Sequence, residues 1–581
     1  MKSMIKLARY LKPYWLAAVL APLLMALEVA MDLSQPRLLQ GIIDIGIANG
    51  DLAFVVHQGA VMIVVALIGM VGGVGCTIYA TTAAMNLGAD VRADLYRKVQ
   101  QLSFGNLDRL EIGGLITRLT NDVDRVHDAV AMFLRILVRA PLLVVGSMIM
   151  AVITCPSLSV LIFVIGGLLV FAIGFVSRKA HPMFTAVQER LDRVNTVMRE
   201  NLMGVRVVKA FVRSDHECRR FGTANDNLAN DTISASALVA SMMPLMMLLM
   251  NLGVVAVIWF GGLQVQRGSM QVGQILAFVN YLVQMLHSLM MMSMILMNIT
   301  RAEASAERIV ELLDTDPEIQ NKPDALTETG LNGKVEFENV GFAYRGNGGE
   351  PVLQNITFTV EPGQTVAILG STGSGKSTLV QLIPRLYDVT EGRVLIDGMD
   401  VRDIAQETLL QRVGVVFQQA TLFSGTIREN ISYGRPEASD AEVAQAAGMA
   451  SAHEFISSLA DGYDAVLGQQ GVNLSGGQKQ RLALARELVQ HPAVLILDDC
   501  TSAVDASTEA SIVRALKEWD HPCTKLIVAQ RINTVFSADK VIVLEDGRIA
   551  AQGTHAELLK TSEAYRGIVQ SQIGDKEHIN A

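Results

Sequence analysis

Residues 365–378 of the chain read Thr365-Val-Ala-Ile-Leu-Gly-Ser-Thr-Gly-Ser-Gly-Lys-Ser-Thr378. The apolar run at its start predicts a buried strand over 365–369, and the periodic apolar residues that follow predict a helix over 378–386. A glycine-rich turn that joins a strand to a helix and ends in Lys-Ser is a P-loop, whose backbone N–H groups surround phosphate oxygens. Lys376 is placed to reach the phosphates and Ser377 to bind Mg²⁺. A chance glycine-rich turn is the alternative, and the strand, the Lys-Ser pair and the helix together disfavour it.

A second apolar run supports this interpretation. Residues 493–498 read Ala-Val-Leu-Ile-Leu-Asp, which predicts a buried strand ending in the carboxylate of Asp498. On its own, such a run is most often ordinary core. On the same domain as a P-loop, a carboxylate at the end of a strand is the usual holder of a Mg²⁺-bound water. We therefore expect Ser377 and Asp498 to share a Mg²⁺ site.

The rest of the chain divides by composition. Its 581 residues exceed one compact domain, and hydrophobic residues make up 50% of them. Charged residues are nearly absent from long stretches before residue 300, whereas short β-rich runs alternate with helical segments after residue 333. We expect a transmembrane domain over 1–300, a linker over 301–332 and an α/β P-loop domain of the RecA-like type over 333–581.

The apolar stretches are long enough to cross a bilayer, which takes about 20 residues in a helix. Two charge-poor regions near 140–177 are separated by Cys155-Pro156, which predicts two spans joined by a tight turn. The total is about six transmembrane helices in an all-α membrane bundle. The expected spans cover 15–40, 52–89, about 129–154, the region up to 177, 232–266 and 268–300.

Charge and cysteine content limit the partners and the location. Lys and Arg concentrate in the connections 90–128 and 178–231, so the positive-inside rule places these connections, the N-terminus and the P-loop domain in the cytosol. A formal net charge of −9 disfavours a nucleic-acid partner. Five scattered cysteines without a CxxC pair indicate reduced thiols. The basic N-terminal residues lack a cleavage site, which favours a retained first span over a signal peptide.

A third motif identifies the resemblance. Leu474-Ser-Gly-Gly-Gln478 precedes a helical pattern over 479–489. This resembles the ABC signature, and the chain resembles one half of a type IV ABC exporter over nearly its whole length. The resemblance implies ATP and Mg²⁺ as ligands. It also implies that the signature contacts ATP held by a second cassette, so that a second homologous half-transporter is required. The implied ATP-binding positions are Gly370, Ser371, Thr372, Gly373, Ser374, Gly375, Lys376, Ser377, Thr378, Ser475, Gly476, Gly477 and Gln478.

Further positions match the family residue by residue. Tyr344 resembles the aromatic residue that stacks on adenine, and Gln418 resembles the Q-loop glutamine that senses Mg²⁺. Residues 502–505, Ser-Ala-Val-Asp, resemble the D-loop that crosses the dimer interface. In the membrane half, 113–122 and 200–211 resemble the two intracellular coupling segments.

The chain departs from the family pattern at two catalytic positions. The residue after Asp498 is normally a Glu that polarises the attacking water, and here it is Asp499. Asp is one methylene shorter, which sets the carboxylate back by roughly 1 Å and slows the reaction on the order of 10²-fold. The switch position, normally His, is Gln530, which carries no cationic imidazole. The loop 468–471 also lacks the Glu often found there.

An intact signature beside a weakened site resembles the degenerate-site subunit of heterodimeric bacterial multidrug exporters. The alternatives are a slowly hydrolysing homodimer and an ATP-gated regulator that does not pump.

Two features bear on the substrate. Glu28 and Asp32 lie one helical turn apart inside the first span, where carboxylates usually face a cavity. They either attract cationic substrates or protons, or lock helices together, for instance against Arg37. The last two spans are rich in Met, which suits promiscuous apolar ligands but also plain packing. These features lean towards hydrophobic or amphipathic small molecules. The fold does not itself fix the direction of transport, and a bacterial inner membrane is expected by analogy only.

Overall fold

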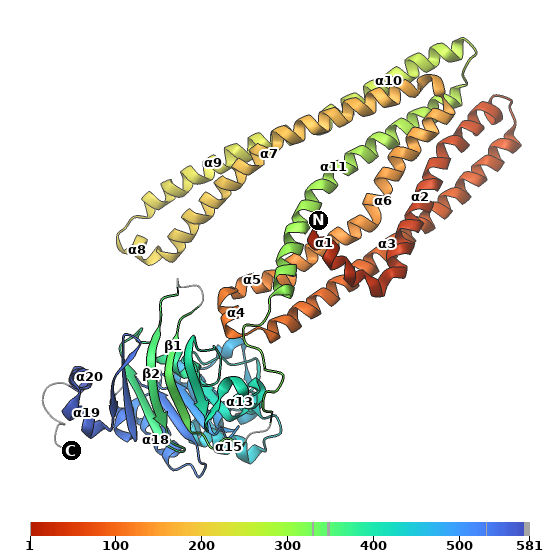
Figure 1. The fold of residues 1–581 in the computed structure, drawn as a ribbon. Helices are drawn as coiled ribbons and strands as arrows, with labels where there is room; N and C mark the ends of the chain where they lie inside the picture. Colours follow the sequence, from red (N-terminus) through yellow and green to blue (C-terminus); the bar gives the residue numbers. More distant parts are fainter. Residues whose placement is uncertain (1, 328–329, 345–348, 530–531, 574–581) are drawn as a thin grey trace. The chain divides into compact units, whose positions relative to one another are not determined.

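The computed structural model describes residues 2–327, 330–344, 349–529 and 532–573, and within helices it does not describe the side chains of 293–298, 532–534 and 572–573. The described chain folds into two compact units (Figure 1). The first comprises the residues up to Gln100 together with Gly113–Thr315. The second comprises Gln101–Ile112 together with the chain from Asp316 onward.

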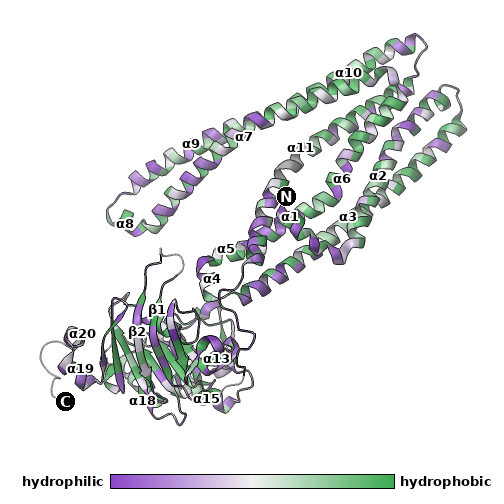
Figure 2. Ribbon diagram, viewed as in Figure 1, coloured by the Kyte–Doolittle hydropathy of each residue, from purple (hydrophilic) through white to green (hydrophobic). Residues whose placement is uncertain are grey.

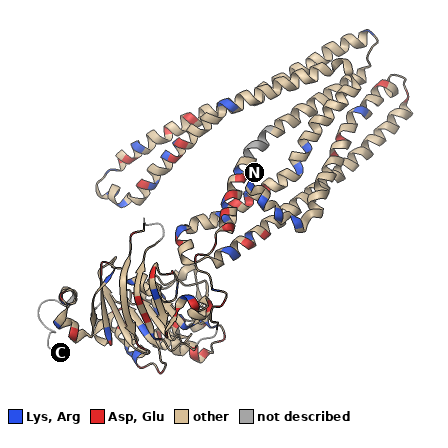
Figure 3. Cartoon of the chain, in the orientation of Figure 1, with Lys and Arg blue, Asp and Glu red and all other residues tan. Residues whose placement is uncertain are grey.

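The first unit is entirely helical. Among the described residues, six helical stretches are long and apolar enough to cross a membrane, which confirms the predicted all-α bundle. In Figure 2, α10 is mainly hydrophobic, whereas α9 carries many hydrophilic residues. In Figure 3, the charged residues likewise lie on α9 rather than on α10. The helices are α1 (Lys2–Leu7), η1 (Ala8–Tyr14), α2 (Trp15–Gly41), η2 (Ile42–Ile47), α3 (Leu52–Gln101), α5 (Ile112–Thr117), η3 (Arg118–Asp122), α6 (Val123–Thr154), η4 (Pro156–Leu158), α7 (Ser159–Met203), α8 (Val205–Ala210), α9 (Ser214–Ala240), α10 (Met242–Gln266) and α11 (Val272–Asp314).

The helices extend beyond their apolar parts. α3 has 50 residues and α7 has 45, so each is about 70 Å long, more than twice the hydrocarbon thickness. The predicted tight turn is present, because Cys155 leaves the helical region at φ −150° and η4 follows. α11 continues without a break to Asp314. The change in composition near residue 300 therefore marks where α11 becomes polar rather than where the helix ends.

A buried ion pair ties α11 to the start of α6. Asp122 accepts hydrogen bonds from Arg308 Nε at 2.8 Å and Nη2 at 2.5 Å. The Asp122 side chain is 0% exposed, whereas that of Arg308 is 41% exposed. Ser305 Oγ contacts the same guanidinium at 3.2 Å. Arg308 is thus the hydrogen-bonded counter-charge of the Asp122 carboxylate, and the charge of Arg125 adds to it from a greater distance.

The second unit is an α/β domain built on three sheets. A six-stranded sheet has the order β12-β11-β3-β10-β9-β6, parallel except at β12, and an antiparallel sheet has the order β2-β1-β4-β5. The small third sheet pairs β7 with β8. The strands are β1 (Val335–Phe342), β2 (Leu353–Val360), β3 (Thr365–Gly370), β4 (Glu391–Ile396), β5 (Met399–Asp400), β6 (Val413–Val416), β7 (Gly425–Thr426), β8 (Val466–Leu467), β9 (Val494–Asp498), β10 (Thr524–Val528), β11 (Lys540–Glu545) and β12 (Arg548–Gly553).

The parallel strands are buried on both faces. Val494 and Ile496 of β9 join one core, and Leu495 and Leu497 join the other. Helices cover these faces, as expected for a parallel sheet. They are α12 (Lys376–Gln381), η5 (Val401–Asp403), α13 (Gln406–Arg412), α14 (Ile427–Ile431), η6 (Ser432–Gly434), α15 (Asp440–Met449), α16 (His453–Ser457), η7 (Gly462–Asp464), η8 (Gln469–Gly471), α17 (Gly476–Leu488), α18 (Ala506–Lys517), η9 (Ile532–Ser537), α19 (His555–Thr561) and α20 (Glu563–Ile573).

One local expectation needs correction. The helix predicted over 378–386 is α12, which begins at Lys376 and ends at Gln381. Beyond it the backbone tightens to i→i+3 bonds, such as Leu382 N to Leu379 O, ahead of Pro384, because proline disfavours helix in the residue before it. The expectation that 113–122 forms a coupling segment stays a prediction. Those residues belong to the first unit, whereas the short helix α4 (Phe104–Arg109) belongs to the second.

α4 is held in the second unit by polar and aromatic contacts. Asn106 is buried, donates Nδ2 to Asp316 O at 3.2 Å and accepts from Glu318 N at 3.0 Å. Phe104 stacks on Phe417 with ring centroids 6.3 Å apart. Because α4 is covalently continuous with α3 and α5, the chain that leaves the membrane bundle folds as part of the α/β domain. The signal that sequence reasoning missed is Ser103-Phe-Gly-Asn106, a capping box.

We predict that Arg308→Ala lowers the melting temperature of the detergent-solubilised protein by several degrees. It leaves the Asp122 carboxylate buried and unpaired, at a cost of roughly 2–3 kcal/mol, below the range for a fully buried pair because Arg308 is partly exposed. The double variant Arg308→Ala/Asp122→Asn should recover most of the loss, since the uncompensated charge is gone. Arg190→Ala, which breaks an exposed pair with Asp231, is the matched control and should change little. Equal losses in the two single variants would contradict this account.

Candidate functional sites

The P-loop follows β3 as predicted. Gly370 has φ +153°, and a Cβ there would lie 2.3 Å from the carbonyl oxygen of Leu544, so only glycine fits. Lys376 Nζ donates to the carbonyl oxygens of Gly370 at 2.9 Å and Ser371 at 2.8 Å, which holds the ammonium over the loop. Within the described chain, the buried hydroxyl of Ser374 has no hydrogen-bond partner. A positive charge and an unsatisfied polar group facing a glycine-rich turn fit a bound phosphate chain.

Ser377 and Asp498 lie together at the carboxyl ends of β3 and β9. Ser377 Oγ donates to Asp498 Oδ1 at 2.9 Å, which brings the two expected Mg²⁺ ligands into contact. Burial raises the pKa of Asp498 above its ordinary value, and the Ser377 hydrogen bond and the charge of Lys376 act in the opposite direction. Burial also lowers the pKa of Lys376. A divalent cation beside Asp498 would favour its charged form, so the donor set fits Mg²⁺.

Asp499 lies in a left-handed turn directly after β9, at φ +48°. Its Oδ2 accepts a hydrogen bond from Gln418 Nε2 at 3.3 Å. The structure therefore brings together two of the three predicted catalytic positions. The third, Gln530, lies outside the described residues, two residues beyond the end of β10 in the sequence.

The signature forms the N-terminus of α17. Ser475 is the N-cap, and its exposed side chain exchanges hydrogen bonds with Gln478 in a capping box. In the described part of the chain, no hydrogen bond joins Ser475 to the P-loop. A Cβ on Gly477 would lie 2.8 Å from Ala503 O, so the signature packs directly against the predicted D-loop.

Gln480 connects these elements, and sequence reasoning missed it. It is buried, accepts from Ala503 N at 3.1 Å and donates to Ser502 Oγ at 3.3 Å. Ser502 Oγ in turn donates to the carbonyl oxygen of Asp499 at 3.0 Å. A polar residue on the apolar face of the helix after the signature was the available signal. The bonds link the signature helix, the D-loop and the residue that follows Asp498.

Tyr344 lies beside the P-loop helix. Its hydroxyl is 3.1 Å from Thr378 Oγ1, and its ring meets Tyr387 edge-on with centroids 5.3 Å apart. Tyr387 donates its hydroxyl to Asp108 of α4 at 2.5 Å. These residues line a cavity of about 570 Å³. Burial raises the pKa of both tyrosines, so they remain neutral aromatic rings.

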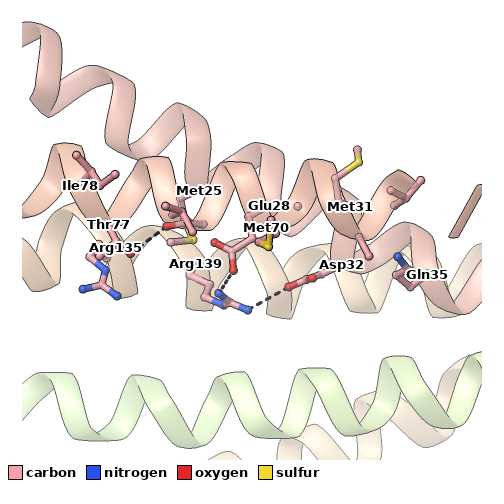
Figure 4. A pocket seen from close by; sticks show the side chains of 15 residues that line it. Met25, Glu28, Met31, Asp32, Gln35, Met70, Thr77, Ile78, Arg135 and Arg139 are labelled. Atoms are coloured by element: carbon pink, nitrogen blue, oxygen red, sulfur yellow. Dashed lines mark hydrogen bonds and ion pairs between the residues drawn. The ribbon is translucent and has the colours of Figure 1, made fainter. Parts of the chain in front are cut away.

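The acidic pair in the first span forms a lock between helices. Arg139 of α6 donates to Glu28, and its Nη2 reaches Asp32 Oδ2 at 3.0 Å (Figure 4). The locking arginine is thus Arg139 rather than the suggested Arg37, because Arg139 reaches both carboxylates from the neighbouring helix. A cavity of about 750 Å³ adjoins the pair.

The methionines of the last two spans divide between packing and exposure. Met246 and Met285 are buried in the helical core, whereas Met243, Met247 and Met291 are exposed. The side chains of Met294 and Met297 lie outside the described part. Packing therefore accounts for some of these residues and leaves others on the surface of the bundle.

Known proteins resemble the chain over both units. The family model described as "ABC transporter transmembrane region" matches residues 19–289, and the model described as "ABC transporter" matches residues 353–502. The ABC transporter ATP-binding protein YfiB of Bacillus subtilis (strain 168) is 43% identical over 569 residues, covering 98% of each chain. The ATP-dependent lipid A-core flippase of Syntrophus aciditrophicus (strain SB) is 33% identical over 503 residues, covering 86% of this chain and 83% of the flippase.

One solved structure is similar along the whole length. It is that of a bacterial Atm1-family ABC exporter with ATP bound, with a TM-score of 0.78 and 25% identity. The match covers 97% of this chain and 100% of the other.

We predict that Tyr344→Ala weakens ATP binding roughly tenfold, because aromatic stacking on a base contributes about 1–3 kcal/mol. Equilibrium binding of radiolabelled ATP to the purified protein measures this. Tyr344→Phe is the control: it keeps the ring, loses only the contact with Thr378, and should bind within about threefold of the original. Unchanged affinity in the alanine variant would show that this ring does not hold the base.

Proposed function

The chain belongs to the ABC transporter family, and on that premise we propose that it is one half of a heterodimeric exporter, with a degenerate ATP site of its own. The family membership makes it a multi-pass membrane protein with an ATP-binding domain whose ATPase activity is coupled to transport, in a fold that acts as a dimer. The different partner chain, the export direction, the bacterial inner membrane and the cytosolic position of the ATP-binding domain are parts of the proposal.

The observation that carries the proposal is Asp499 beside an intact signature. An Asp in place of the longer Glu holds its carboxylate back from an attacking water. The contact with Gln418 occupies Oδ2, which leaves that oxygen less available to a water molecule. The signature residues, by contrast, are complete, and Ser475 and Gly476 are exposed at a helix N-terminus. These features favour slow turnover at the chain's own site and full support of a site on another chain.

Each residue then has a distinct role. The P-loop backbone and Lys376 bind the phosphates of ATP, and Ser377 with Asp498 holds Mg²⁺, which neutralises phosphate charge when bound. Ser475 and the N–H groups after it contact the γ-phosphate held by the partner cassette. Gln480 and Ser502 link the two sites within this chain. Closing the two cassettes around ATP would open the membrane bundle outward, and hydrolysis at the competent site would reset it.

We propose hydrophobic or amphipathic small molecules, multidrug-type or lipid-like, as the substrates. The flippase among the relatives is named for a lipid, and the helical unit combines a cavity of about 750 Å³ with exposed methionines. The Arg139 lock speaks against a free acidic site for cations, since both carboxylates already share a counter-charge.

The composition of the native complex tests the heterodimer. The complex would be extracted from its host in mild detergent with a tag on this chain, and the intact masses of its chains measured. We expect this chain at 62.8 kDa and a second, different chain of similar size. A dimer containing only the 62.8 kDa chain would refute the proposal and favour a slow homodimer. ATP-dependent conductance without vectorial uptake would instead favour a regulator that does not pump.

We predict that two variants separate the roles of the two sites in that complex. Ser475→Ala should lower ATPase turnover on the order of 10²-fold, because it removes a donor at the competent site. Asp499→Asn should change turnover by no more than about threefold, because its site contributes little. Ser439→Ala controls for lost helix capping, since Ser439 forms the same capping box on α15 of this domain. A large loss in Asp499→Asn would mean that this site hydrolyses ATP and that the division of roles is wrong.

A further inference from the structure

Two cavities of the helical unit share one arginine. The first, of about 750 Å³, is lined by Glu28, Asp32, Arg139 and Arg135 among apolar side chains. The second, of about 680 Å³, is lined by Arg125, Asp128, Arg135 and Arg301 with alanines, Met132 and Ile136. Arg135 therefore stands where the two cavities meet. Figure 4 shows it on the same helix as Arg139, with its guanidinium directed away from Glu28 and Asp32.

The charges of the two cavities differ. In the first, Arg139 is paired with both carboxylates. In the second, three arginines and one carboxylate, that of Asp128, are among the lining residues. Among the residues that the structure describes, Arg125, Arg135 and Arg301 form no direct ion pair or hydrogen bond, and the Nε of Arg135 is buried without a partner. The charge of Arg125 acts on the nearby Asp122 carboxylate, and Asp128 contacts His127 at 3.3 Å. Since arginine stays charged at any physiological pH, the lining of the second cavity carries more positive than negative charge and one unsatisfied donor, on Arg135.

Helix geometry places Arg135 at the level of lipid head groups and Arg125 and Arg301 further towards the water. α6 ends at Thr154, and Arg135 lies nineteen residues earlier, which is about 28 Å along the helix. The hydrocarbon core is about 30 Å thick, so Arg135 is close to its cytosolic boundary in the proposed orientation. Arg125 on α6 and Arg301 on α11 each lie twenty-nine residues from the outer ends of their helices, about 44 Å, and so beyond that boundary.

The deeper cavity supplies an apolar wall. The apolar residues that line it, next to the acidic pair, are Met25, Met31, Val65, Met70, Val74 and Ile78. Methionine side chains adapt to apolar ligands of different shape. Together the two cavities offer a positive group at head-group depth and an apolar space reaching into the hydrocarbon region.

We propose that Arg135, with Arg125 and Arg301, binds the anionic head of an amphiphile, a phosphate or a carboxylate, while its tail lies in the methionine-lined cavity. The inference rests on the proposed transport function and names its substrate class. Arginine suits this task because its planar donors pair with two oxygens of such a head group at once. The amphiphile enters from the cytosolic leaflet, where its head already lies at the depth of Arg135.

Binding to the intact complex in nanodiscs of neutral lipid tests the proposal, first without ATP. Dodecyl phosphate and dodecyltrimethylammonium share one tail and differ in the sign of the head, and inorganic phosphate has the head without the tail. We expect saturable binding of dodecyl phosphate that weakens with salt. Equal binding of the cationic probe would overturn the proposal. Binding of inorganic phosphate as tight as that of dodecyl phosphate would overturn the assignment of an amphiphile.

Variants locate the site. Arg135→Gln should raise the dissociation constant of dodecyl phosphate roughly tenfold, the loss expected for one charge-assisted hydrogen bond. Arg135→Lys keeps the charge and should recover part of the affinity, which a merely structural role would not require. Arg267→Gln removes one positive charge at the exposed turn after α10, outside both cavities, and should bind as the original does. Equal effects of Arg135→Gln and Arg267→Gln would refute the site.

A second readout separates this inference from the transport function on which it rests. Adding ATP tests whether dodecyl phosphate stimulates turnover and moves across the bilayer. Binding that depends on Arg135 without any ATP-driven movement would leave the site standing and overturn transport. ATP-driven movement of other amphiphiles without preference for an anionic head would leave transport standing and overturn the site.

Discussion

The architecture depends on one constraint, that backbone N–H and C=O groups in hydrocarbon must be satisfied within their own helix. Six helical stretches meet it, and several do not stop at the membrane boundary. α3 runs unbroken for 50 residues before the chain turns into α4, which folds into the α/β domain through Asn106 and Phe104. A continuous helix is stiff, so a shift at one end of α3 is transmitted along its length. The requirement that backbone groups be satisfied within each helix thus also makes the long membrane helices rigid.

At the proposed nucleotide site, two neighbouring carboxylates make different hydrogen bonds. Asp498, the last residue of β9, accepts from Ser377 of the P-loop. Asp499, the next residue, accepts from Gln418 through its side chain and from Ser502 through its carbonyl oxygen. Gln480 carries the connection to the signature helix. A change in the backbone at Asp499 would therefore shift Ser502 and, through Gln480, the signature helix α17, where a second cassette would dock in the proposed dimer. In the proposed degenerate site, ATP binding alone would then be enough to set the position of the signature.

The sequence predicted what local signals specify. The P-loop, the strand ending in Asp498 and the signature helix all lie within short windows. The structure has β9 over Val494–Asp498, one residue shorter than expected, and α17 over Gly476–Leu488, which begins three residues before the expected helix. The errors arose where the deciding contact is distant. Arg139 lies more than 100 residues from Glu28, and nothing in either span favours it over Arg37. The docking of α4 rests on residues more than 200 positions away, such as Asp316, so only its capping box was visible locally. The end of α12 near Pro384 was a local signal that periodicity outweighed.

Charge decides what the helical unit is suited to bind. Intramembrane acids invite the idea of a cationic ligand, but a carboxylate attracts only to the extent that its charge is unmatched. Arg139 pairs with both Glu28 and Asp32, so one positive charge stands against two negative ones, and removing Arg139 would leave both carboxylates without their ion-pair partner. Among the described residues that line the second cavity, three arginines stand against one carboxylate. Glu28 and Asp32 pair with Arg139 and so hold α2 against α6, whereas Arg125 and Arg135, nearer the start of α6, are not used in this lock. These two arginines are therefore available to a ligand, and the proposed preference for an anionic head group follows from their charge.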